Sequence, residues 1–342
     1  MTDLLQVPTA RREAIGRIAA SIRPGMTVAL STHINADGDG CGSQTALARL
    51  LGQMGVRAFI VNPTPWPELF RWLLGDDVED RSAEGAQALA EVDRLIVLDI
   101  SDIGRLGGLA DAVRALPEDA LVIDHHLPGH EPPGRTMLSD TAACATAELV
   151  FDFARERGLT ITAAIARSLY TALITDTGGF RFGNTSPRCL AIAAELLTAG
   201  VDPEQMYARI YGSVPLGRLH LLRDALDTLE VDMAHGMAWV RIHAGALERH
   251  GVSSEDLDGI SEYPRTIAGV RLAVLFRDLG HGRVKVSFRS LAGVNVNTLA
   301  RSFGGGGHAR ASGALVAGTL AEVEARVLGE ARHQLETGTL AD

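Results

Sequence analysis

Cysteine is scarce in this chain of 342 residues, and long apolar runs are missing. Cys41, Cys144 and Cys189 form no CxxC pair, so neither a zinc knuckle nor a disulfide framework is expected. No apolar run reaches the roughly 20 residues that a membrane helix needs. Residues 1–20 lack the basic head, apolar core and cleavage site of a secretory signal. These absences predict a cytoplasmic protein without a membrane-bound part.

Positive charge and aromatic side chains are also in short supply. The formal net charge is −10, which argues against a protein that grips long nucleic acid by neutralising its phosphates. Aromatic residues make up only 5% of the chain, and no basic groove rich in aromatics is evident. A short anionic substrate, held by a local basic pocket, remains compatible with this composition.

The length and the order of apolar segments predict two domains. A chain of 342 residues exceeds one ordinary core. In its first part, β-branched runs that are apolar on both faces alternate with helical stretches, as in parallel strands covered on both sides. The expected strands are 27–32, 57–62, 94–100 and 120–126. The fold class is therefore α/β, with an N-terminal doubly wound, mainly parallel sheet.

The pattern of apolar and polar residues changes after a largely helical stretch. Three later segments, MAWVRIH, GVRLAVLFRD and GRVKVSFRS, alternate in the manner of antiparallel strands, and LGHG at 279–282 is expected to form a hairpin turn. We therefore expect a first domain over 1–200, a helical linker over 201–234 and a smaller α+β domain over 235–342.

Acidic and imidazole side chains gather at four places, each expected at the carboxyl end of a strand. In an open parallel sheet, that edge is where ligands bind. An Asp-Gly-Asp-Gly segment is often only a turn, and a lone Asp after a strand is often a helix cap. Three adjacent polar residues cannot all cap one helix, however, so the four places together favour a site. The residues are His33, Asp37 and Asp39; Asp99; Asp124, His125 and His126; and Asp176.

Crowded carboxylates repel one another unless cations lie between them. A pair of divalent ions removes this repulsion and supports hydrolysis at phosphorus. Mixed Asp and His ligands suit Mn²⁺ best, with Mg²⁺, Co²⁺ and Zn²⁺ as alternatives. The absence of cysteine ligands argues against a purely structural zinc site.

Five motifs of the chain resemble those of the DHH phosphoesterases. The segments HINADGDGCGS (33–43), LDISDIGRLG (98–107), IDHH (123–126) and YTALITDTGGFRFGNT (170–185) resemble four family motifs in the family's order. GGGGHARASG (304–313) is similar to the signature of the DHH-associated C-terminal domain. A two-domain chain without the further domains of a RecJ exonuclease is most similar to the nanoRNase and pAp-phosphatase branch (NrnA type).

The resemblance implies roles for the clustered residues. Its first metal ion would be held by His33, Asp37, Asp99 and Asp176, and its second by Asp39, Asp99, His125 and Asp176. His126 would face the substrate phosphate or the leaving group. Asp124 would orient an imidazole without binding the metal itself.

The C-terminal domain is expected to bind the substrate. Glycine-rich backbone can close on phosphate oxygens, and an arginine can make a forked contact with phosphate. A flexible turn, and an exposed strand residue in the case of Arg289, remain open as alternatives. The expected substrate-binding residues are Arg289, Gly305, Gly306, Gly307, His308 and Arg310. The active site is expected in a cleft between the two domains.

The expected enzyme is a Mn²⁺-dependent phosphodiesterase that hydrolyses short oligoribonucleotides to mononucleotides and acts as a pAp 3′-phosphatase. Alternatives are a phosphodiesterase for linear or cyclic dinucleotides such as pApA and c-di-AMP, a single-strand exonuclease on longer RNA or DNA, and an inorganic pyrophosphatase. A nucleotide-binding module without catalysis is the non-enzymatic alternative. Short RNA or a nucleotide is the expected partner, and a homodimer is an alternative to a monomer.

Overall fold

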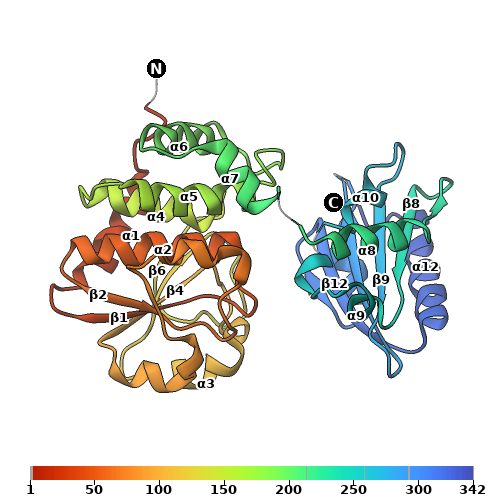
Figure 1. Ribbon diagram of the computed structural model, residues 1–342, viewed down its shortest axis with the longest axis horizontal. Helices are drawn as coiled ribbons and strands as arrows, with labels where there is room; N and C mark the ends of the chain where they lie inside the picture. The colour runs from red at the N-terminus through yellow and green to blue at the C-terminus, as the bar shows by residue number, and fades with distance from the viewer. Residues whose placement is uncertain (1–2, 213, 258, 292, 342) are drawn as a thin grey trace. The chain divides into compact units, whose positions relative to one another are not determined.

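The chain forms two compact units in a computed structural model that describes residues 3–212, 214–257, 259–291 and 293–341 (Figure 1). Contacts divide it into Met1–Gly212 and Ser213–Asp342. The stretch 201–234 is split between the two, because α7 (Pro203–Ile210) belongs to the first unit and α8 (Leu216–Leu226) to the second. No helix in the described residues is long and apolar enough to cross a membrane.

The first unit is built on a six-stranded sheet in which all neighbouring strands are parallel. The strand order is β3-β2-β1-β4-β5-β6, which confirms the doubly wound prediction. The order reverses between β1 and β4, and such a switch point leaves a crevice at the carboxyl ends of the strands. The strands are β1 (Thr27–Ser31), β2 (Arg57–Ile60), β3 (Glu79–Asp80), β4 (Arg94–Leu98), β5 (Leu121–Asp124) and β6 (Thr136–Ser139).

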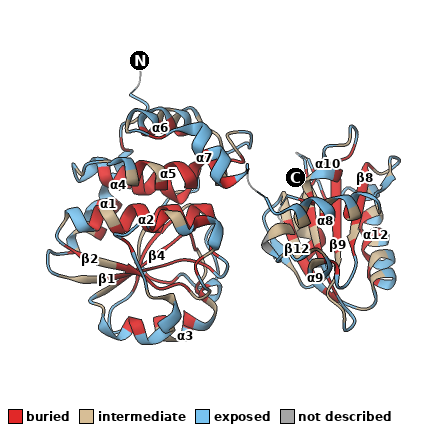
Figure 2. Cartoon of the chain, in the orientation of Figure 1, coloured by how far each residue is buried: buried red, intermediate tan, exposed pale blue. Residues whose placement is uncertain are grey.

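Helices cover both faces of this sheet because the central strands are apolar on both sides (Figure 2). On one face, a single core joins the strands to helices α1 (Thr9–Ala20), α2 (Gly38–Gln53), α4 (Thr146–Glu156), α5 (Ala163–Asp176), α6 (Pro187–Thr198) and α7. The other face packs against the short helices η2 (Ser82–Glu91), η3 (Ile103–Leu109) and α3 (Ala110–Arg114). A further turn, η1 (Glu68–Leu73), packs beside α2.

The second unit holds a six-stranded mixed sheet in the order β11-β12-β10-β9-β8-β7. Its strands are β7 (Glu230–Asp232), β8 (Met237–Ile242), β9 (Leu272–Asp278), β10 (Arg283–Ser290), β11 (Gly306–Gly307) and β12 (Ala311–Ala317). The hairpin at 279–282 joins β9 to β10 as predicted. The prediction of antiparallel strands throughout was wrong, since β8 and β9 pair in parallel. The helical segments between them carry the chain back to the same end, as a parallel pair requires.

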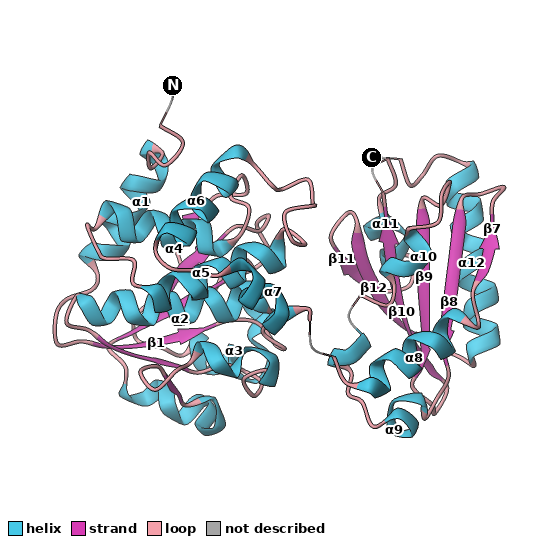
Figure 3. Ribbon diagram, turned by 45° about the horizontal axis from the view of Figure 1, so that its top comes forward, coloured by secondary structure: helices cyan, strands magenta, loops and turns pink. Residues whose placement is uncertain are grey.

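The two faces of this second sheet pack against different helices (Figure 3). α12 (Leu320–Glu336) and α11 (Val296–Arg301) share a core with one face. α8, α9 (Ala246–His250), α10 (Glu262–Arg265) and the turn η4 (Glu255–Leu257) lie against the other face, around β8 and β9.

Candidate metal centre

The loop after β1 places the first three site residues. His33 follows the strand by two positions and is buried. Asp37 is the N-cap of α2, where its Oδ1 accepts hydrogen bonds from the amides of Asp39 and Gly40. Asp39 lies in the first turn of α2. The amino end of a helix favours carboxylates, so the local fold stabilises both acids here.

The strands β4 and β5 deliver the next group. Asp99 follows β4 directly and has a φ of 62°, a left-handed conformation that is uncommon outside glycine and recurs at functional sites. Asp124 is the last residue of β5, and His125 and His126 follow it. β4 borders the switch point of the sheet, and β5 is the next strand beyond it.

Asp176 corrects one sequence expectation, because it ends a helix rather than a strand. The apolar segment before it continues without a break from Ala163 as α5. An apolar run with β-branched residues is compatible with a buried helix as well as a buried strand. α5 packs against α2 and directs its carboxyl end to the same edge.

The facing atoms of these residues lie too far apart for hydrogen bonds but close enough to share an ion. His33 Nε2 is 3.6 Å from Asp37 Oδ2 and 3.4 Å from Asp99 Oδ2. His125 Nε2 is 3.7 Å from both Asp39 Oδ2 and Asp176 Oδ2, and 3.6 Å from Asp99 Oδ1. Asp99 therefore contributes one oxygen to each of two neighbouring groups.

Backbone carbonyls fix the tautomers of the two ligand-like imidazoles. His33 Nδ1 donates to Ile34 O at 3.0 Å, and His125 Nδ1 donates to Ala143 O at 3.2 Å. In each ring Nε2 is left facing the carboxylates, the position from which it can bind a cation once it carries no proton.

His126 has a different partner. Its Nδ1 donates to Asp124 Oδ1 at 2.8 Å, which fixes the orientation of the ring. Asp124 is fully buried, and its Oδ2 has no hydrogen-bond donor among the described residues. In the triplet Asp124-His125-His126, the aspartate therefore orients the second histidine, His126.

The electrostatics of the cluster suit cations. Burial, followed by repulsion from neighbouring carboxylates, raises the pKa of Asp39 well above its ordinary value. Burial raises the pKa of Asp176 to about 6, and Asp99 adds to this although His125 opposes it. Burial works against the charged form of His33, but Asp37 and Asp99 raise its pKa to about 10. Four acids that repel one another, with two imidazoles oriented toward them, fit divalent ions with oxygen and nitrogen ligands.

Several supporting residues were missed by sequence reasoning. Thr146, at the start of α4, donates its amide to Asp39 Oδ2 at 2.6 Å and its hydroxyl to Asp99 Oδ1 at 3.1 Å. Asn184 donates to Asp176 Oδ2 at 3.2 Å. Arg105, an exposed residue of η3, lies near enough to act electrostatically on Asp37 and His126. Arg105 and Asn184 lie within two of the family motifs, 98–107 and 170–185, but no role was assigned to them there. Thr146 lies outside those motifs.

In the second unit, the glycine-rich segment forms a tight hairpin instead of a flexible turn. Gly306 and Gly307 form β11 and pair with β12, and His308 N and Ala311 O close the turn at 2.8 Å. A Cβ on Gly305 would lie 2.1 Å from Gly313 O, whereas one on Gly306 would meet nothing within 4 Å. Among the glycines at 304–307, Gly306 alone has neither a close neighbour nor a positive φ that would require glycine.

The two arginines expected to bind substrate already have contacts in the second unit. Arg289 Nε lies 3.1 Å from Glu262 Oε1, and Arg310 donates to Val294 O at 2.8 Å. The structure therefore places both on the strand and turn around the glycine hairpin, with part of their hydrogen-bonding capacity used.

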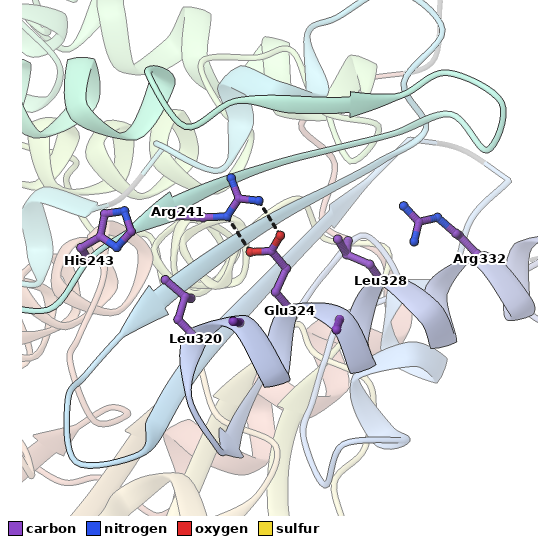
Figure 4. Close-up of a pocket in the computed structure, with 8 residues that line it drawn as sticks. Arg241, His243, Leu320, Glu324, Leu328 and Arg332 are labelled. Carbon is purple, nitrogen blue, oxygen red and sulfur yellow. Dashed lines mark hydrogen bonds and ion pairs between the residues drawn. The ribbon is translucent and has the colours of Figure 1, made fainter.

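A separate hollow of about 440 Å³ lies in the second unit between β8 and α12 (Figure 4). Leu320 and Leu328 line it together with Arg241, whose guanidinium is paired with Glu324 and Glu230. Both arginines that line the hollow are therefore paired with acids, since Arg332 also lies 2.8 Å from Asp232.

Comparisons with known proteins agree with this architecture. Residues 27–173 match the family described as DHH family, N-terminal domain, and residues 239–337 match the DHHA1 domain. The bifunctional oligoribonuclease and PAP phosphatase NrnA of Thermus thermophilus is 34% identical over 310 residues, covering 90% of this chain and 89% of that protein. The protein of the same name from Bacillus subtilis is 28% identical over 299 residues, covering 85% and 89%.

Solved structures show the same fold. An exopolyphosphatase-related protein from Bacteroides fragilis superposes with a TM-score of 0.87 at 26% identity, covering 95% of this chain and 98% of that one. RecJ from Thermus thermophilus, in complex with Mn²⁺, gives 0.52 at 18% identity and supports the fold alone. The fold and the matches define the protein as a phosphoester hydrolase. The chain belongs to the DHH family, in the group of the NrnA proteins, as its motifs indicated.

Proposed function

We propose that this protein hydrolyses very short RNA to mononucleotides and removes the 3′-phosphate from pAp, using two divalent ions, preferably Mn²⁺. The observation that carries the proposal is the shared position of Asp99, one of whose oxygens faces His33 and the other His125. Relatives named as oligoribonucleases and PAP phosphatases match the chain over most of its length.

The two groups of facing atoms support two ligand sets, and the family resemblance adds Asp176 to the first of them. We assign His33, Asp37, Asp99 and Asp176 to the first ion, and Asp39, Asp99, His125 and Asp176 to the second. When bound, such a pair lowers the pKa of water and stabilises the charge that develops on the phosphate oxygens.

The chain's own residues prepare this chemistry. Ile34 O and Ala143 O keep the Nδ1 proton on His33 and His125, so that neither ring has to reorient when a cation binds. Asp124 accepts the hydrogen bond from Nδ1 of His126. Nε2 of that ring is therefore the atom that can donate a proton to the departing oxygen. Arg105 adds a positive charge for a phosphate that enters beside Asp37 and His126.

The second unit, which we assign to substrate binding over 235–342, supplies the remaining contacts. The open space at Gly306 lets a phosphate oxygen approach the backbone amides of β11. Arg289, Arg310 and His308 surround that hairpin and are assigned to the same substrate.

One panel of substrates tests the proposal. Purified protein with Mn²⁺ is offered pAp, pApA, c-di-AMP, a five-nucleotide RNA and a long single-stranded DNA, and the products are separated by chromatography. Turnover of pAp and the short RNA is expected. If none of these substrates is hydrolysed, the proposed enzymatic activity is refuted. Fast cleavage of the long DNA together with slow cleavage of dinucleotides would refute the proposed preference for short substrates.

A further inference from the structure

One face of the second sheet carries a line of basic side chains on β10. The strand alternates, with Val284, Val286 and Phe288 buried on the side of α12. Arg283, Lys285 and Arg289 point to the other side, where the first two are exposed and the third is partly exposed. The chain has only this one lysine, in a protein with a net charge of −10.

Lys285 lies directly opposite Arg277 in the antiparallel pairing of β9 and β10. Like charges in that position destabilise a sheet. Among the described residues, Arg277, Arg283 and Lys285 form no ion pair. Three cations without an acidic partner form a positively charged surface that attracts anions.

The acids near this surface do not neutralise it. Glu248 on α9 acts on Arg277 only at a distance. Glu262 is already engaged by Arg265 and Arg289. Other cations of the unit do have acidic partners, as Arg332 has in Asp232 at 2.8 Å and Arg223 in Asp224 at 2.7 Å.

The basic line is connected to the glycine hairpin by strand register. Gly306 on β11 lies opposite Gly313 on β12, and Gly313 lies opposite Ser287 on β10. Lys285 is two residues further along the same face. With strands about 4.8 Å apart and a rise of about 3.3 Å per residue, the Cα atoms of Gly306 and Lys285 are roughly 12 Å apart. The residues in the row between them, Gly313 and Ser287, have small side chains, and the exposed Leu315 lies beside Lys285.

We propose that Arg277, Arg283 and Lys285 bind the phosphates of an RNA substrate beyond the nucleotide held at the glycine hairpin. This proposal rests on the proposed function and adds a contact that depends on substrate length. A mononucleotide such as pAp, bound at Gly306, does not extend to Lys285, whereas an RNA of four or five nucleotides does. RNA is favoured over an anionic lipid surface or an acidic protein because the three cations share one face with the proposed nucleotide hairpin.

Paired charge-removing variants test the length dependence. In an Arg277→Gln/Lys285→Gln variant, KM for a five-nucleotide RNA is expected to rise about tenfold, the loss of two exposed phosphate contacts. Values for pAp are expected to stay unchanged. The matched control is Arg326→Gln, which removes a charge from exposed α12 on the opposite face of the sheet. Equal losses for pAp and the five-nucleotide RNA, or an equal loss in the control, would overturn the proposal.

Binding without turnover separates this proposal from the function on which it rests. A fluorescent, hydrolysis-resistant phosphorothioate RNA of five nucleotides is titrated while its anisotropy is followed at several salt concentrations. The double variant should weaken binding and reduce the slope of log K against log salt by about 0.7 per lost phosphate contact. If wild type hydrolyses nothing but shows this difference, the proposed function fails and the binding site stands. Equal affinity and slope in both proteins would overturn the site.

The single lysine allows a direct footprint. Acetylation with an amine-reactive reagent, read by mass spectrometry, reports on Lys285 and on the N-terminal amine as an internal control. Five-nucleotide RNA should protect Lys285 several-fold, and pAp should not. Protection by anionic phospholipid vesicles and not by RNA would assign the surface to a membrane and refute the proposal.

Discussion

Arg11, on the first helix, donates a hydrogen bond from Nη1 to Glu148 Oε1 at 2.6 Å, although 137 positions separate the two residues. The other oxygen of Glu148 accepts from the amide of Cys144 at 3.1 Å. This hydrogen bond closes the turn before α4. Thr146, two residues after Cys144 in the same turn, donates its amide to Asp39. A buried ion cluster therefore lies directly behind the candidate metal centre and holds α1 against α4.

Replacing Arg11 by Leu should destabilise the first unit by about 3 kcal/mol, because removal of one partner leaves buried charge uncompensated. Arg188 remains paired with Glu148 and limits the loss. The neighbouring Arg12→Leu is the control, since Arg12 is 46% exposed and lies 3.4 Å from Glu156. Its effect should stay below about 1 kcal/mol. Urea unfolding followed by the fluorescence of Trp66 and Trp72, in a Trp239→Phe background, measures this unit. Equal effects of the two substitutions would contradict the cluster's role.

Stability of the metal-free protein should fall as the pH rises. The folded pKa of Asp176 is about 6, above its unfolded value, so its ionised form costs stability once the pH exceeds that range. His33, with a folded pKa of about 10, stabilises the fold fully below pH 6.5, and this contribution is lost as the pH rises through 10. Both act in one direction, and the free energy of unfolding should drop by at least about 2 kcal/mol between pH 5 and pH 9.

Added Mn²⁺ should reverse this trend between pH 5 and pH 7, because metal ligands must be deprotonated. Melting temperatures of chelator-treated protein, with and without MnCl₂, provide the measurement. The same pH slope in both samples would show that the acids do not hold metal.

Two glycine substitutions separate folding from substrate binding. Gly306→Ala should leave stability nearly unchanged, because its Cβ enters open space, but should raise KM about tenfold if phosphate approaches there. Gly305→Ala places a Cβ 2.1 Å from Gly313 O and should destabilise the second unit. Melting curves and initial rates with pAp distinguish the two. Unchanged kinetics in a stable Gly306→Ala protein would remove the hairpin from the binding site.

The two histidines of the triplet should fail in different ways. His125→Ala removes a side chain that faces three carboxylates, so it should weaken Mn²⁺ binding at least tenfold. His126→Ala should retain the metal and lose rate by about 10²–10⁴-fold, as expected for a general acid. Calorimetric titration with MnCl₂ and kcat at saturating metal measure the two effects. Loss of metal in both variants would instead make His126 a ligand.

The first sheet and most of its site could be predicted because each relevant signal is local. β1, β4 and β5 are apolar on both faces, and the polar residues that follow them end those runs abruptly. Asp176 was placed on a strand, since a short apolar segment with β-branched residues fits either element. Only the packing of α5 against α2 decides between them.

Contacts between distant segments were not accessible from the sequence. Arg11 reads as an ordinary polar residue of an N-terminal helix, and its burial depends on acids more than a hundred positions away. The parallel pairing of β8 and β9 depends likewise on how the helices between them pack. Alternation along a strand predicts which side is buried but not the direction of its neighbour.

The outermost strands of both sheets bear on how the protein behaves at high concentration. β3 and β11 are two residues long and β7 is three, so these borders expose few unpaired amides and carbonyls. A long, flat border invites another chain to add a strand, and short border strands are one way in which proteins avoid such aggregation. At these three borders, one in the first sheet and two in the second, the protein is protected against growth into fibres.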